Sequence, residues 1–335
     1  MISCVAIALD GTAMPASLVG SINKRFSMQQ TATISSPNLK ALFTTIALLT
    51  LPPLFWAGNF IVGRSVSGVV PPLTLSFLRW VIASLVLLPF TWRILAKEWP
   101  LYRQHRRRIL LASVTGICAF NSLIYVGLQS TTANNAMILN AFIPLLISLF
   151  GVLFLKLQLR VNQWLGMIIS FMGVLAIVSH GSLQQLLSFS LNPGDIWVFS
   201  AMICWAVYTL TIKNMPAAIN RYGLMSIQMM IGVVILLPFY LGELTTVGAP
   251  QWSYHAAFAL AYVGIMPSVV AYLIYSTSVA RLGPARAGQS INLLPVFGVV
   301  LSLLFLGESI HLYQLAGMAL IFAGLFATTR SAGRD

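Results

Sequence analysis

Long apolar stretches separated by short polar segments fill the chain from about residue 41 to residue 329. Each stretch holds about 20 residues, the length that an α-helix needs to cross a bilayer. The ten predicted membrane spans are Ala41–Val62, Leu73–Trp92, Ile109–Leu128, Ala133–Leu155, Val161–Ser179, Gly194–Ile212, Tyr222–Leu241, Ala256–Ala280, Pro284–Leu306 and Leu312–Thr329. Helices are expected because a bilayer offers no partners for bare backbone N–H and C=O groups. The pattern therefore predicts an all-α integral membrane protein with the lipid bilayer as a partner.

The two ends of the chain are more polar than the spans. Residues 1–40 carry Lys24 and Arg25 but lack the charged-then-apolar order of a signal peptide. We interpret them as a flexible tail, with Met14 and Met28 as alternative starts. Residues 330–335 are interpreted as a short basic C-terminal tail.

Composition supports the membrane interpretation. Hydrophobic residues make up 58% of the chain and charged residues 7%, whereas a soluble domain has about 25% charged residues. The net charge of +13 does not indicate a nucleic-acid partner, because the basic residues lie between apolar runs and not on one soluble face. The three cysteines are far apart without a CxxC pair, so neither a disulfide framework nor a metal site is predicted. No cofactor is expected.

Basic residues sort to one side of the ten-span arrangement. Of the 19 Lys and Arg residues, 17 fall in the tails and in the second, fourth, sixth and eighth connections. The exceptions are Arg64 on the opposite side and Arg79 within a span. Since Lys and Arg favour cytoplasmic loops, both termini are predicted to be cytoplasmic. The expected location is the cell membrane, either an inner or a plasma membrane.

An internal repeat joins the two halves of the chain. Phe55-Trp56-Ala57 matches Cys204-Trp205-Ala206 at an offset of 149 residues, and Leu87-Leu88-Pro89 matches Leu236-Leu237-Pro238 at the same offset. Pro144 matches Pro295 at an offset of 151. The predicted repeats are residues 41–180 and 194–329, each with five spans. Because five is odd, the repeats would cross the membrane in opposite directions, which is the architecture of many alternating-access transporters.

These residues also carry a resemblance to a known family. The chain resembles the ten-helix EamA-domain branch of the drug/metabolite transporter superfamily through Trp56-Ala57-Gly58-Asn59-Phe60, Pro71-Pro72-Leu73, Phe77-Leu78-Arg79-Trp80, Pro144 and Phe305-Leu306-Gly307-Glu308. The family pattern has Leu-Gly-Glu after the fourth span as well, but this chain has Leu155-Lys156-Leu157 there. The resemblance implies transport of amino acids or related metabolites, most often export.

Arg79 is the only charged residue well inside a predicted span. A charge within a membrane is costly and by default suggests a function. Its planar guanidinium suits a substrate carboxylate. The alternative is a structural role, in which Arg79 braces helix carbonyls or a polar neighbour.

Two prolines at equivalent repeat positions suggest breaks in the fourth and ninth spans. Pro144 removes the N–H that would bond the carbonyl of Asn140, and Pro295 does the same for Ile291. We predict gating hinges or site walls here, with a packing kink as the alternative. Gly166 and Gly173, like Gly317 and Gly324 in the other half, are seven residues apart and predict close helix packing, with a homodimer contact left open.

Other polar and aromatic side chains within spans complete the candidate substrate site. Together with Arg79, the candidates are Trp56, Asn59, Asn121, Tyr125, Asn140, Trp205, Tyr208, Tyr272 and Asn292. A cavity with aromatic walls and a few amides would suit a zwitterionic or aromatic metabolite, while helix packing is the alternative for each residue. Since no Asp or Glu lies in mid-membrane, proton coupling through carboxylates is disfavoured.

The predicted function is a secondary transporter that exports amino acids or related small metabolites. An uptake carrier for a vitamin, nucleoside or cofactor is the main alternative. A membrane-embedded enzyme is disfavoured because the chain has no HExxH, no GxSxG and no phosphate-binding loop. A channel is the other distant alternative, distinguished by flux without saturation.

Overall fold

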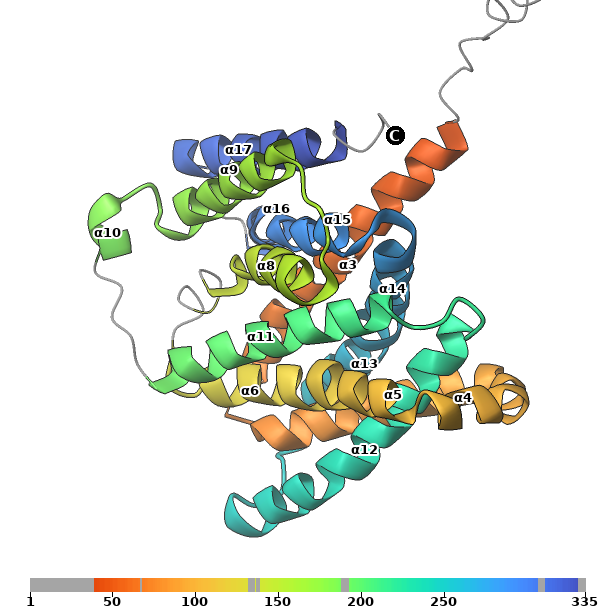
Figure 1. Ribbon diagram of the computed structural model, residues 1–335. Coiled ribbons are helices and arrows are strands. Elements are labelled where there is room, and N and C mark those ends of the chain that lie inside the picture. Colours follow the sequence, from red (N-terminus) through yellow and green to blue (C-terminus); the bar gives the residue numbers. More distant parts are fainter. Residues whose placement is uncertain are drawn as a thin grey trace, which may run out of the picture. The chain divides into compact units, whose positions relative to one another are not determined.

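The computed structural model describes residues 39–66, 68–131, 136, 139–187, 193–306 and 311–330. Within these residues the secondary structure is entirely helical, with no strand. The chain divides into two units, Met1–Ile46 and Ala47–Asp335. The helices (Figure 1) are α3 Leu39–Ser65, α4 Pro72–Gln104, α5 Arg106–Ala112, η1 Ser113–Ala119, α6 Phe120–Gly127, α8 Ile143–Leu155, α9 Val161–Val178, α10 Leu183–Leu187, α11 Pro193–Lys213, α12 Arg221–Thr246, α13 Tyr254–Ile265, η2 Met266–Val270, α14 Ala271–Leu282, α15 Pro284–Gln289, η3 Ser290–Leu293, α16 Leu294–Leu306 and α17 Leu312–Arg330.

Every predicted span contains helix, and six helical stretches in the described part are long and apolar enough to cross a membrane: Leu39–Asn59, Pro72–Gln104, Arg106–Gly127, Pro193–Lys213, Arg221–Thr246 and Tyr254–Leu282. Three shorter apolar helices are Ile143–Leu155, Val161–Ile177 and Leu312–Thr328. Large apolar side chains such as Leu85, Phe90 and Phe258 are exposed on these helices, as expected for surfaces that face lipid. The chain is therefore a multi-pass, all-helical membrane protein. The predicted tail residues 1–38 and 331–335, and the motif residues Gly307 and Glu308, lie outside the described residues.

The fourth and ninth predicted spans are interrupted helices. In the fourth, residues 141–142 form a turn before α8, whose first turn contains Pro144. In the ninth, the 3-10 segment η3 separates α15 from α16, whose first turn contains Pro295. A proline is tolerated in the first turn of a helix because the N–H that it lacks would have no partner there. The prolines thus mark the breaks that the sequence predicted.

The third and eighth spans each contain a π-helix, which sequence periodicity did not predict. η1 lies between α5 and α6, and η2 lies between α13 and α14. A π-helix shifts the hydrogen-bond ladder by one residue and often marks a functional site. Gly116 in η1 and Pro267 in η2 are 151 residues apart, the same offset that relates Pro144 to Pro295.

Two helix pairs from the two halves pack side by side and antiparallel. In α9 and α17, Gly166 lies against the backbone of Gly324, and Gly173 lies against Gly317 (Figure 1). These four glycines therefore pack within the chain, as the packing interpretation predicted. In α4 and α12, the hydroxyl of Thr91 bonds Ser226 at 2.9 Å.

Polar contacts also join the two ends of the α4–α12 pair. Near the C-terminal end of α4, the carboxylate of Glu98 accepts hydrogen bonds from the Asn220 N–H at 3.0 Å and the Tyr102 hydroxyl at 2.8 Å. Near the C-terminal end of α12, Glu243 accepts from the backbone N–H groups of Leu73 and Thr74. Each helix therefore carries a glutamate that binds the N-terminal end of the other.

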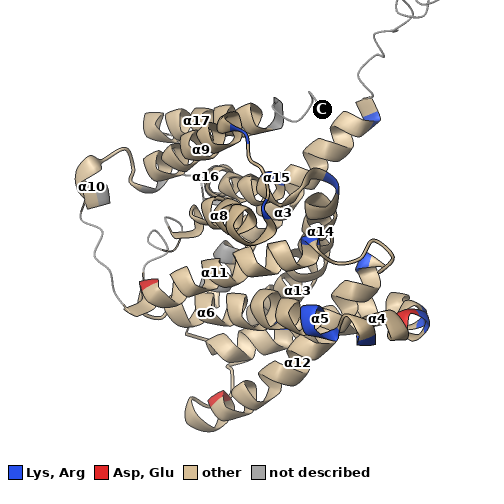
Figure 2. Cartoon of the chain, in the orientation of Figure 1, with Lys and Arg blue, Asp and Glu red and all other residues tan. Residues whose placement is uncertain are grey.

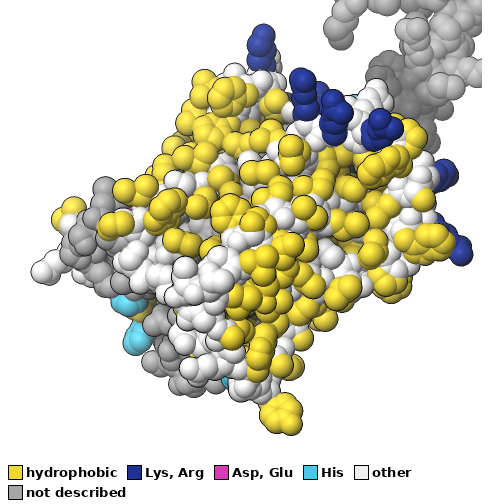
Figure 3. All heavy atoms as spheres, turned by 90° about the horizontal axis from the view of Figure 1, so that it is seen from below, with side chains coloured by type: hydrophobic (Ala, Val, Ile, Leu, Met, Phe, Trp, Pro, Cys, Tyr) yellow, Lys and Arg dark blue, Asp and Glu magenta, His cyan; other side chains and the backbone are white. Residues whose placement is uncertain are grey.

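Charged residues are concentrated at the helix ends. Figure 2 shows Lys and Arg gathered on α5 and at one end of α4, while most of the helical surface is uncharged. Figure 3 shows a broad hydrophobic face with Lys and Arg along one edge and histidine at another. An apolar band bounded by a basic edge is the surface expected of a membrane protein.

Candidate functional site

Arg79 is the centre of a buried polar network formed by three segments. It lies two turns into α4, about 10 Å along the helix from its first residue, and only 1% of the residue is exposed. Its Nε donates to Ser268 Oγ at 2.8 Å, and its Nη1 donates to Asn121 Oδ1 at 2.9 Å and Tyr125 Oη at 2.7 Å. α4, α6 and η2 are therefore joined through one guanidinium.

Asn121 connects this guanidinium to Tyr272 of α14. Its Nδ2 donates to the Tyr272 hydroxyl at 3.1 Å, and that hydroxyl donates onward to the carbonyl of Gly116 at 2.8 Å. The acceptor lies in the π-helix η1, where the shifted ladder alters backbone pairing. The network thus runs from a charge in α4 to the backbone of a distorted helix.

Trp56 makes the corresponding contact with the other π-helix. Its indole Nε1 donates to the carbonyl of Pro267 at 3.1 Å. Gly116 and Pro267 therefore accept hydrogen bonds from aromatic side chains of the opposite predicted half, Tyr272 and Trp56 respectively. This reciprocal pattern places both π-helices beside one cluster of rings.

The rings themselves form one contiguous cluster. Trp56 and Trp205 meet edge to face with centroids 5.1 Å apart, and Trp205 lies 5.3 Å from Tyr272 and 5.2 Å from Tyr208. Edge-to-face packing at these distances is favourable beyond the buried area alone. Trp80 joins the cluster through Tyr272 and also lies 5.0 Å from the Arg79 guanidinium carbon. The cluster is closed to solvent in this conformation, with Trp205 and Tyr272 each 1% exposed.

Several buried polar atoms near this cluster lack partners. The Tyr208 hydroxyl and the indole nitrogens of Trp80 and Trp205 form no hydrogen bond within the described part of the chain. A buried polar group without a partner costs about 1–3 kcal/mol. Such groups are unusual in a well-packed protein core. They are expected where a ligand or a water molecule binds in another conformation of the protein.

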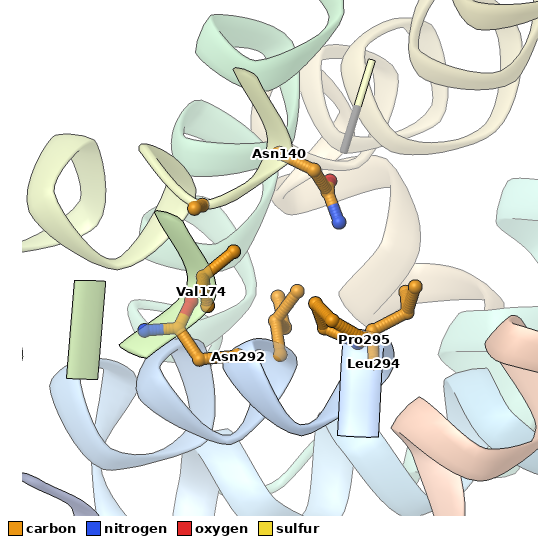
Figure 4. Close-up of a pocket in the computed structure, with 7 residues that line it drawn as sticks. Asn140, Val174, Asn292, Leu294 and Pro295 are labelled. Carbon is orange, nitrogen blue, oxygen red and sulfur yellow. The ribbon is translucent and has the colours of Figure 1, made fainter. Parts of the chain in front are cut away.

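Asn140 and Asn292 lie at a second location, apart from the ring cluster, at the helix breaks before α8 and α16. They line a narrow hollow together with Ala141, Val174, Ile291, Leu294 and Pro295 (Figure 4). Asn292 Nδ2 donates to Ser170 Oγ at 3.0 Å, while its Oδ1 is buried without a partner. In this conformation the hollow is too narrow to hold a water molecule.

The candidates predicted from sequence therefore separate into two groups. Arg79, Asn121, Tyr125, Trp56, Trp205, Tyr208 and Tyr272 belong to the aromatic and polar network around Arg79, which we call the Arg79 network. Asn140, Asn292, Pro144 and Pro295 belong to the helix breaks. Asn59 lies one turn beyond Trp56 on α3 and contacts neither group through a hydrogen bond.

Three contributors to the Arg79 network were not among the predicted site residues: Ser268, Tyr275 and Trp80. Tyr275 packs 5.4 Å from Trp56 and shares a 2.9 Å hydrogen bond with Thr209. Ser268 directly follows Pro267 in the middle of a long apolar run, and this helix-breaking proline marks the segment but not the serine itself. A serine alone carries no such signal, because small polar residues are common in membrane helices.

The fold and this buried network define a multi-pass helical membrane protein with a polar, aromatic site among its helices. The sequence profile of the EamA-like transporter family matches the chain twice, over residues 43–179 and 192–330. The chain belongs to the EamA-like transporter family, and it is a membrane transporter.

Similar proteins agree with this assignment. The uncharacterized transporter YyaM of Bacillus subtilis is 25% identical over 82% of this chain and 90% of its own length. An uncharacterized transporter of Archaeoglobus fulgidus is 29% identical over 85% of this chain and 97% of its own. A probable terminal-alkyne amino-acid exporter of Streptantibioticus cattleyicolor is 27% identical over 66% of this chain and 72% of its own.

A solved structure supports the fold. A crystal structure, 18% identical in sequence, superposes with a TM-score of 0.68 and covers 87% of this chain and 98% of the other. At this identity the match concerns the fold alone.

Proposed function

We propose that this protein is a secondary carrier that exports amino acids or related small metabolites by alternating access between two inverted five-helix repeats. The observation that carries the proposal is the reciprocal bonding of the π-helices. Tyr272 donates to Gly116, and Trp56 donates to Pro267, so each predicted repeat binds the distorted helix of the other. A site shared in this way is opened from either side when the repeats rock against each other.

The antiparallel helix pairs favour the inverted repeat. α9 and α17 are the last spans of the two predicted repeats, and α4 and α12 are the second spans. Equivalent helices that pack antiparallel are expected around a two-fold axis in the membrane plane. The double match of the family profile, near residues 41–180 and 194–329, favours the same division.

The nature of the site favours a small zwitterionic or aromatic cargo. Arg79 offers a positive charge, and Trp56, Trp205 and Tyr272 offer aromatic faces that bind apolar or cationic groups. The Streptantibioticus relative is named as a probable exporter of a terminal-alkyne amino acid. Together these observations favour amino acids over phosphorylated or polymeric substrates.

Direction and placement are part of the proposal. We place the protein in a plasma or inner membrane with both termini in the cytoplasm, because basic residues collect on one side of the predicted spans. Cytoplasmic metabolites would then enter the site from the basic side and leave from the other.

A direct transport experiment tests the proposal. Purified protein in liposomes loaded with a panel of radiolabelled amino acids should show saturable efflux and counterflow, with competition between cargoes. Growth of deletion and overexpression strains on inhibitory amino acids gives the first candidates for that panel. Flux without saturation would indicate a channel, inward accumulation of a vitamin or nucleoside would indicate the uptake alternative, and conversion of a compound would indicate an enzyme.

A further inference from the structure

The guanidinium of Arg79 has N–H donors that are not used in hydrogen bonds with the described residues. Its Nε and Nη1 donate to Ser268, Asn121 and Tyr125, which are all neutral acceptors. Its second terminal nitrogen, Nη2, carries two N–H groups and forms no hydrogen bond with any described residue. One edge of this buried cation therefore lacks an acceptor within the described part of the chain.

No described carboxylate neutralises this cation. Glu98 binds Tyr102 and the N–H of Asn220, and Glu243 binds the N-terminal end of α4. Asp195 bonds the hydroxyl of Thr131. Removing a charge from water without a counter-ion is strongly unfavourable, so a buried guanidinium held only by neutral groups is poised to bind an anion.

The surroundings orient this cation, as a binding site requires. Asn121 and Tyr125 hold Nη1 from α6, Ser268 holds Nε from η2, and the Trp80 ring lies 5.0 Å from the guanidinium carbon. Ser268 is itself fixed, since its hydroxyl donates to the carbonyl of Val263 at 2.7 Å. The position of Nη2 is thus set before any ligand arrives, which lowers the entropic cost of binding.

We propose that Arg79 is the anchor for a carboxylate of the transported molecule, and that the cargo is accordingly a carboxylate-bearing small molecule. This inference rests on the proposed transport function. The carboxylate accepts a charge-assisted hydrogen bond from Nη2. Such bonds are stronger than those between neutral groups, and a neutral analogue of the cargo cannot form one of equal strength. The aromatic rings of Trp56, Trp205 and Tyr272 then face the remainder of the cargo when the helices separate.

A purely structural brace makes a different prediction. Joining α4, α6 and η2 requires only hydrogen bonds, so a brace gives no reason to distinguish an acid from its amide. An anchor does distinguish them, because the amide lacks the negative charge while keeping nearly the same shape. The comparison of acid with amide therefore separates the two roles.

The experiment uses the purified full-length protein in lipid nanodiscs. The probes are the twenty amino acids, acetate and benzoate, each compared with its primary amide where one exists, and binding is read from thermal melting and tryptophan fluorescence. At least one carboxylate should bind the wild-type protein about tenfold or more tightly than its amide. Arg79→Gln should remove this preference, Arg79→Lys should keep part of it, and Arg93→Gln, an exposed arginine on the same helix, should leave it unchanged.

A second variant keeps the inference testable if Arg79→Gln does not fold. Asn121→Asp places a carboxylate at the position of an oxygen that is now 2.9 Å from Nη1. This internal anion should lower the affinity for external carboxylates by about tenfold. The new ion pair should stabilise the protein, and the loss of the amide donor to Tyr272 should offset part of that gain. A folded Asn121→Asp variant that still binds acids as the wild type does would overturn the anchor role.

The outcomes distinguish the two proposals. The anchor inference fails if acids and amides bind the wild type equally, if no carboxylate in the panel binds, or if the Arg79 variants keep the acid preference. The transport proposal fails separately if bound compounds never cross the liposome membrane. Acid-selective binding without flux would therefore overturn the carrier and retain the anchor.

Discussion

The carboxylate of Glu243 accepts hydrogen bonds from both the backbone N–H and the hydroxyl of Thr74, at 2.5 and 2.8 Å. It also accepts from the N–H of Leu73 at 3.0 Å. The first N–H groups of a helix have no partner within the helix, and the helix dipole favours an anion there. A side chain near the end of α12 therefore caps the start of α4, a helix about 170 residues away in sequence.

Loss of this cap should destabilise the protein. We expect Glu243→Ala to lower the free energy of unfolding by about 1–3 kcal/mol, because it leaves buried N–H groups of α4 without an acceptor. Glu243→Gln keeps an oxygen acceptor and should lose less. Thermal melting followed by tryptophan fluorescence measures both. Thr245→Ala, an exposed neighbour on the same helix, is the control and should change the melting temperature little.

The hydroxyl of Tyr272 is expected to matter more than that of Tyr275. Tyr272→Phe keeps the ring but leaves the carbonyl of Gly116 and the amide of Asn121 short of one partner each. The cost should be about 1–3 kcal/mol in stability, together with reduced transport. Tyr275→Phe removes a single bond to Thr209 and should cost less. Equal effects of the two variants on melting and on liposome flux would contradict the importance of the π-helix contact.

The helices of this fold could be predicted from the sequence because they depend on local runs of apolar residues. Each apolar run had to become a helix in a bilayer, and Pro144 and Pro295 marked the two breaks. The π-helix that contains Gly116 could not be predicted, because a one-residue shift in the backbone hydrogen bonding leaves the hydrophobic pattern unchanged. α4 also continues to Gln104, well past the predicted end at Trp92, since residues 94–98 are mostly good helix formers, and the helix then runs on through Pro100.

The candidate site could be predicted only in part, because some of its contacts depend on tertiary packing. Arg79 was conspicuous as a lone intramembrane charge, and the aromatic residues near it were named as candidates. Its partner Ser268, 189 residues further along, could not be singled out from other serines, because the pairing depends on tertiary packing. Sequence also gave no means of separating Asn140 from the Arg79 network.

The close packing of α9 and α17 should tolerate no added methyl group. In Gly173→Ala the new Cβ would lie about 2.6 Å from the carbonyl oxygen of Gly317 and 2.9 Å from Ile321. We expect a loss of about 1–3 kcal/mol in stability from this overpacking. Gly298→Ala is the matched control, since nothing lies within 4 Å of its Cβ, and it should be neutral or stabilising by up to about 1 kcal/mol. Thermal melting of the two variants measures the difference. A Gly173→Ala variant that melted at the same temperature as Gly298→Ala would refute the packing role.

Lys156 ends α8 in a backbone conformation that residues other than glycine rarely adopt. It caps α8 in the left-handed conformation, with φ 52°, a position at which helices commonly have glycine. A side chain in that conformation costs about 1–2 kcal/mol, which glycine avoids. Lys156→Gly should therefore raise the melting temperature. Gly283→Ala tests the converse, because φ is 89° there with open space around the Cβ, and it should lower the melting temperature. A lower melting temperature for Lys156→Gly would show that the charge outweighs the backbone strain.

The orientation of the chain is open to a direct labelling test. Arg106 lies at the start of α5, among the basic residues that predict a cytoplasmic location, and Gln251 is an exposed residue between α12 and α13 on the predicted external side. Single cysteines at these two positions, in a background with Cys4, Cys118 and Cys204 replaced by serine, place one thiol on each predicted side. A membrane-impermeant maleimide added to intact cells should label Gln251→Cys, whereas Arg106→Cys should react only after the membrane is opened. Labelling of Arg106→Cys in intact cells would reverse the orientation and with it the proposed direction of export. Labelling of both thiols from one side would instead mean an even number of crossings between them, which would contradict the five spans that the inverted repeats place there.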